Sequence, residues 1–118
     1  MTLAAEPAYV AAVLVLYADL PDTLLRPSPQ DRSFLARRWY QQQVPLPVVE
    51  SALLLASLRR AVRPADSAPL PPIRSLAYFQ PVISELQRQP LPDGYLDYLR
   101  LKLRRVAAAD PRSKNSVF

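Results

Sequence analysis

The amino-acid sequence of 118 residues contains no histidine, no cysteine and only one glycine, Gly94. Without histidine or cysteine, the chain lacks the side chains of most acid–base and nucleophilic sites, and a zinc site would need carboxylates alone. One glycine cannot build a glycine-rich phosphate-binding loop. These absences predict a protein that is not an enzyme and binds no metal or other cofactor. A metal-dependent nuclease built from carboxylates is the one catalytic alternative.

Long apolar runs are also missing from the sequence. The longest candidate, residues 9–16, is far shorter than the roughly 18 residues that a membrane-spanning helix needs. Residues 1–20 show neither the basic start nor the small-residue cleavage site of a signal peptide. We therefore expect a cytoplasmic protein that has no membrane partner.

Proline, by contrast, is abundant, with 14 residues. Proline is tolerated in the first turn of a helix and disfavoured inside strands, and tight hairpins need glycine or asparagine, which are scarce here. This balance predicts an all-α fold, a compact bundle of about five helices with proline-rich connectors. Half of the residues are apolar, so we expect a single domain over residues 1–118, with flexible ends at 1–6 and 112–118.

Proline positions and apolar spacing predict where the helices lie. Pro81 would lie inside the fourth helix and kink it, unless that helix begins at Leu76 behind a Ser75 cap. The first helix is apolar on most sides, which predicts a central core helix or a helix covered by a partner. The expected helices are residues 7–20, 29–43, 45 or 47 to 63, 73–89 and 93–109, with an extended linker at 64–72.

Trp39, the single tryptophan, lies on the apolar side of the second expected helix. Spacings of four and five residues group it with Leu35 and Phe34, and Val49 and Leu53 are expected opposite. This pattern predicts a core anchor and not a platform for stacking bases.

The charge is unevenly distributed along the chain, whose net charge is +5. Residues 1–58 carry four arginines and five acids, whereas residues 59–118 carry eleven basic and five acidic residues. Such asymmetry is typical of contact with nucleic acid or another polyanion. A solvated face in an arginine-rich composition is the alternative. The candidate nucleic-acid-binding residues of the C-terminal part are Arg100, Lys102, Arg104, Arg105, Arg112 and Lys114.

A second cluster of candidates, Arg59, Arg60 and Arg63, closes the third expected helix. These arginines are the next candidate site for nucleic acid if the C-terminal residues do not bind it. Cations near a helix C-terminus also complement the helix dipole, which gives them a purely structural alternative.

The last expected helix carries the sharpest prediction. The side chains expected to face the core are Leu96, Leu99, Leu103 and Val106. This leaves four cations, at positions 100, 102, 104 and 105, on the exposed side. If these cations neutralise four phosphates, the logarithm of affinity should fall with the logarithm of salt at a slope of about −3 to −4.

The middle of the chain contains a tryptophan-bearing helix at residues 35–39 and a short turn. A helix beginning VPLPVVESA at residues 44–52 follows, and then the spacing Tyr78-x-x-x-Val82-x-x-x-Leu86. Over roughly half of the chain this order resembles the helical domain of DnaD-like replication-initiation and primosomal proteins. The family has tryptophan where Leu86 stands. The resemblance implies a DNA-associated accessory module of a replication or mobile-element assembly.

Two other classes of function remain open. The chain could be a protein-only scaffold that docks through its first helix, or a small helical subunit of an RNA-guided, CRISPR-type complex. No reading helix or stacking-aromatic motif is evident, so the sequence does not choose between DNA and RNA. The expected partners are a nucleic-acid phosphate backbone and either a protein partner or a second copy of the chain.

Overall fold

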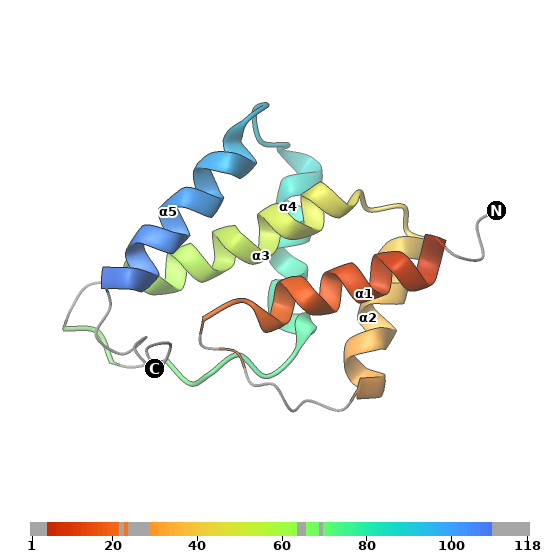
Figure 1. The fold of residues 1–118 in the computed structure, drawn as a ribbon, viewed down its shortest axis with the longest axis horizontal. Coiled ribbons are helices and arrows are strands. Elements are labelled where there is room, and N and C mark those ends of the chain that lie inside the picture. Colours follow the sequence, from red (N-terminus) through yellow and green to blue (C-terminus); the bar gives the residue numbers. More distant parts are fainter. Residues whose placement is uncertain (1–4, 22, 24–28, 64–65, 69, 110–118) are drawn as a thin grey trace.

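The computed structural model describes residues 5–21, 23, 29–63, 66–68 and 70–109. They form five α-helices and one short 3₁₀-helix, η1, and contain no strand, so the predicted all-α bundle is confirmed. Figure 1 shows the helices packed around one another in a compact bundle. The elements are α1 Ala5–Ala18, α2 Pro29–Gln41, α3 Leu46–Ala61, η1 Leu76–Phe79, α4 Gln80–Arg88 and α5 Tyr95–Ala109.

The central element of the bundle is α3, which packs against α1, η1, α4 and α5. In Figure 1 it crosses the middle of the molecule, with α5 on one side and the α1–α2 pair on the other. Its buried side chains lie at helical spacing and include Val49, Ala52 and Leu53. The central position expected for the first helix therefore belongs to α3.

Helix α1 is buried on one side only. Val13 and Tyr17 are buried four residues apart, whereas Val15 between them is 60% exposed. Because successive residues rotate by about 100° around a helix, Val15 points away from both. The expectation that this helix is buried on most sides is wrong. The helix also begins at Ala5, so residues 5–6, expected to fray, are helical; residues 1–4 and 112–118 lie outside the described part.

The segment around Pro81 adopts the second of the two predicted arrangements. The Ser75 side chain accepts a hydrogen bond of 3.0 Å from the backbone N–H of Ala77 and caps η1. Helix α4 then begins at Gln80, which places Pro81 in its first turn, where the missing N–H removes no helical hydrogen bond. The continuous helix over residues 73–89 with an interior kink is wrong.

The extended segment before η1 is tied to the end of α1. Thr23 and Ile73 form an isolated parallel bridge. The hydroxyl of Tyr17 donates a hydrogen bond of 3.2 Å to the carbonyl of Ile73. Phe79, fully buried, meets Tyr17 edge to face with ring centroids 6.2 Å apart. These contacts close the core between the end of α1 and the segment that contains Ile73 and η1.

Trp39 is fully buried, which confirms its predicted place in the core. Its indole N–H donates a hydrogen bond of 2.7 Å to the Oε1 atom of Gln80, the first residue of α4. Leu35 packs against the core cluster as expected. Phe34 is instead 59% exposed, so its predicted place beside Trp39 is wrong. Five residues of helical rotation set the two side chains about 140° apart.

Candidate nucleic-acid interface

Helix α5 presents one face to the core and a basic face to solvent. Leu99 and Leu103 are buried, as their spacing predicted, and α5 packs along α3. Leu96 and Val106, also expected to face inward, are partly buried. The helical period places the cations of α5 on the remaining sides.

Arg100 is held by two acids. Its Nε and Nη2 atoms donate hydrogen bonds of 2.8 Å each to the two carboxylate oxygens of Glu50 on α3. Its Nη1 atom donates a third, of 2.9 Å, to Oδ1 of Asp97. The hydrogen bonds to Glu50 raise the pKa of the Arg100 guanidinium above its ordinary value. Arg100 therefore fastens α5 to α3, and a phosphate would have to compete with two carboxylates for it.

Three other cations of α5, Lys102, Arg104 and Arg105, are exposed, and no acid in the described part of the chain pairs with them. We call these three residues the α5 basic surface. The rotation of about 100° per residue sets Arg104 and Arg105 on either side of Leu101, while Lys102 lies one turn beyond Tyr98. The cations thus surround exposed apolar side chains and do not form the row of four expected from the sequence.

The second cluster of candidates lines one hollow on the opposite flank of α3. Positions 50 and 59 are nine residues apart, which is about two and a half turns and sets them on opposite sides of the helix. Glu50 therefore reaches α5, and Arg59 reaches α4. The two predicted clusters therefore lie on different surfaces. The arginine hollow encloses about 280 Å³ and is lined by Ala56, Arg59, Arg60, Arg63, Leu70, Tyr78 and Val82.

Each arginine of the arginine hollow has a partner within the fold. Arg59 binds both carboxylate oxygens of Glu85, at 3.0 and 2.7 Å, and this hydrogen bonding lowers the pKa of Glu85. Arg60 donates to the carbonyl of Pro71 at 2.9 Å, and Arg63 donates to that of Ala68 at 2.8 Å. These contacts hold the connecting segment and α4 against α3. The remaining candidates, Arg112 and Lys114, lie outside the described residues.

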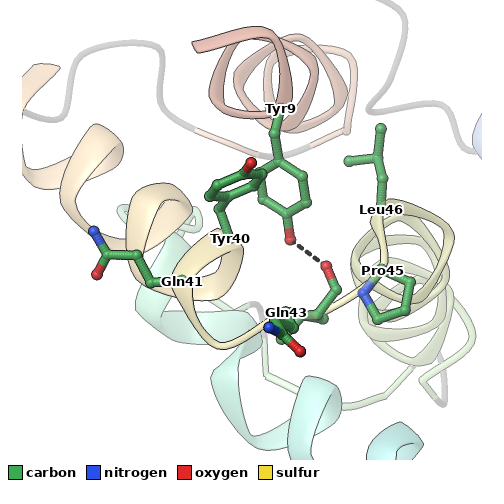
Figure 2. A pocket seen from close by; sticks show the side chains of 7 residues that line it. Tyr9, Tyr40, Gln41, Gln43, Pro45 and Leu46 are labelled. Carbon is green, nitrogen blue, oxygen red and sulfur yellow. Dashed lines mark hydrogen bonds between the residues drawn. The ribbon is translucent and has the colours of Figure 1, made fainter. Parts of the chain in front are cut away.

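A pocket that sequence reasoning missed lies between α1, the end of α2 and the start of α3 (Figure 2). It encloses about 460 Å³, and Tyr9 and Tyr40 meet there edge to face, with centroids 5.3 Å apart. The hydroxyl of Tyr9 donates a hydrogen bond of 2.8 Å to the carbonyl of Val44. The lining contains no charged side chain, so this pocket adds nothing to a phosphate contact. The sequence signal that could have revealed this pocket is Tyr9, because a partly buried tyrosine hydroxyl needs a hydrogen-bond partner.

Burial raises the pKa of Tyr9 from 10.0 to about 12. Between these values the unfolded chain ionises Tyr9 while the folded protein keeps it protonated, so the free energy of unfolding falls as pH rises. Below pH 10 this contribution is fully present. We expect Tyr9→Phe to show a shallower decline above pH 10, measured by urea unfolding at several pH values. At neutral pH the lost hydrogen bond should cost about 1 kcal/mol. Equal declines in both proteins would contradict this account.

No three acidic side chains in the described part of the chain come together as a metal site would require. None of the helices described there is both long and apolar enough to span a membrane. Comparisons with protein-family models, curated proteins and solved structures found no match. The assignment of a function therefore depends on the chemistry of the surfaces described above.

Proposed function

We propose that this chain is a non-catalytic helical module of the cytoplasm that contacts the phosphate backbone of a nucleic acid through α5. The observation that carries the proposal is the α5 basic surface, whose three exposed cations have no acidic partner in the described part of the chain. Cations gathered on one helix attract phosphates and steer association without reading base sequence.

The helix dipole does not explain the α5 basic surface. The dipole acts within the last turn of a helix, and the last turn of α5 contains no basic residue. Helix α3 differs, because Arg59 and Arg60 do lie in its last turn. The helix dipole already offered the α3 arginines a structural alternative at the level of sequence. Their partners within the fold add a second structural explanation, which the α5 basic surface lacks.

The first test removes the α5 basic surface with Lys102→Gln, Arg104→Gln and Arg105→Gln in one variant. Because Arg100 is occupied, at most three phosphates and not four are neutralised, and the salt slope for the natural chain should be no steeper than about −3 on duplex and −2 on single strands. The triple variant should lose nearly all of this slope. Fluorescence anisotropy across a salt series measures it.

A matched control removes the same charge elsewhere. Arg37→Gln, Arg38→Gln and Arg74→Gln change exposed residues of α2 and the segment before η1, and α2 lies apart from α5 in Figure 1. This control should keep most of the affinity. If the control loses the salt slope and the α5 variant keeps it, the phosphate contact lies on the surface of the control residues and not on α5.

The assignment to a replication or mobile-element assembly is supported only by the resemblance to DnaD-like helical domains. A protein-only scaffold is the second candidate, because Val15 is 60% exposed on α1 and gives an apolar contact point there. No binding to DNA or RNA at low salt would favour this scaffold, whereas binding to RNA alone would favour the subunit of an RNA-guided complex.

A further inference from the structure

The α5 basic surface surrounds two large side chains that lie on the surface and not in the core. Tyr98 is 48% exposed and Leu101 is 42% exposed, although Leu99 between them is fully buried. At about 100° per residue, Tyr98 and Leu101 lie on the outward side of α5, amid Lys102, Arg104 and Arg105. The outward face of α5 therefore presents an aromatic ring and an aliphatic side chain with cations beside them.

The ring of Tyr98 is supported from one side. Its centroid lies 5.2 Å from that of Tyr95, at an interplanar angle of 42°, and Tyr95 is itself partly buried at the start of α5. Contact between neighbouring aromatic rings restrains both of them. Tyr98 thus combines an anchored position with an exposed aromatic surface.

We propose that this face of α5 binds single-stranded nucleic acid in preference to duplex, with an unpaired base stacked on Tyr98 and the flanking phosphates on Lys102 and Arg105. The inference rests on the function proposed above and names its substrate class. Bases in a duplex stack on one another, whereas an unpaired base offers its π-face to an aromatic side chain. A duplex bound through its phosphates would leave the exposed side chains of Tyr98 and Leu101 uncovered.

The spacing along α5 suits a short stretch of strand. At 1.5 Å per residue, Lys102 lies about 6 Å and Arg105 about 10 Å from Tyr98 along the helix axis. A strand whose base leaves the stack spans more than the roughly 3.4 Å per nucleotide of a duplex strand, so this distance of about 10 Å corresponds to at most three nucleotides. One stacked base with neighbouring phosphates within reach of two cations fits this length, and stacking adds no preference for a particular base.

Tyr78 shows why exposure alone does not make a platform. It is 43% exposed, but the guanidinium of Arg60 lies 5.5 Å from its ring centroid and the ring of Phe79 lies 5.3 Å away. Its ring is therefore engaged within the fold beside the arginine hollow. Tyr78 is the matched control for Tyr98: a second exposed tyrosine beside arginines, on another surface.

The test compares a fluorescein-labelled oligothymidine, an oligouridine and a mixed-sequence duplex by anisotropy at low salt. The natural chain should bind the single strands more tightly than the duplex. Tyr98→Leu should weaken single-strand binding about tenfold and leave duplex binding unchanged, because only stacking is removed. Tyr98→Phe should bind like the natural chain, and so should the control Tyr78→Leu. Circular dichroism checks that each variant is folded.

The outcomes separate this inference from the proposed function. Binding that prefers duplex, or a folded Tyr98→Leu variant with unchanged single-strand affinity, would overturn the stacking role; salt-dependent binding through the α5 basic surface would still support the phosphate contact. If no nucleic acid binds at low salt, both proposals fail and an acidic protein partner becomes the occupant to test. The preference of the natural chain for single strands is the first measurement, and the Tyr98→Leu variant then tests whether that preference comes from Tyr98.

Discussion

Replacing Trp39 with alanine is expected to lower the free energy of unfolding by about 3–5 kcal/mol. The side chain is fully buried, so its removal leaves a large cavity between α2 and its neighbours. Gln80 also loses the indole N–H that donates to it at 2.7 Å. Urea unfolding followed by far-ultraviolet ellipticity measures the loss, because the variant no longer contains the only tryptophan.

Phe34→Ala is the matched control on the same helix. Phe34 is 59% exposed, and substitutions at such surface positions change stability by about 0.5 kcal/mol or less. Trp39→Phe should fall between the two, since it keeps a ring in the core but removes the donor to Gln80 and part of the buried volume. A Trp39→Ala variant as stable as the natural chain would show that this side chain is not a core anchor.

Phe79→Ala should produce a loss of similar size, about 3–5 kcal/mol. Phe79 is fully buried at the junction of η1 and α4 and meets Tyr17 of α1 edge to face. Its removal loosens the contact that closes the core between distant parts of the chain. Thermal unfolding and urea midpoints both measure this effect.

The neighbouring residue supplies the comparison. Tyr78→Ala removes a ring of similar size that is 43% exposed, together with its cation–π contact to Arg60, which is worth about 0.5–1 kcal/mol. Adjacent aromatic residues should therefore differ several-fold in their effect on stability. Equal losses at the two positions would mean that burial does not account for the contribution of Phe79 to stability.

Local sequence signals were sufficient for the helices because their causes are local. Proline in first helical turns and the scarcity of glycine predicted five helices, and Ser75 offered the cap that the structure uses. The predictions that were wrong concern side chains whose rotation around the helix axis sets them on a different side from the core. Phe34 stands five residues from Trp39, which places it on another side, and Val15 lies on the outward side of an almost wholly apolar helix.

The candidate site was less accessible from the sequence because it depends on contacts between distant residues. Arg100 and its partner Glu50 are separated by 50 positions, and Arg59 and Glu85 by 26. Helical spacing predicts charge pairs three or four residues apart, but it does not predict pairs between residues this far apart in the sequence. The sequence therefore identified the cations, but not which of them are engaged within the fold and which surround Tyr98.

The prolines that begin the helices also act on the chain before it folds. Pro45 precedes α3 with φ of −61°, and Pro81 lies in the first turn of α4. The proline ring fixes nearly the same φ in the unfolded chain, so less conformational entropy is lost at these positions on folding. Heating consequently releases less entropy from them. For a given enthalpy of unfolding, a smaller entropy raises the temperature at which the two states balance. The restricted freedom of the unfolded chain at these prolines therefore raises the temperature at which the bundle unfolds.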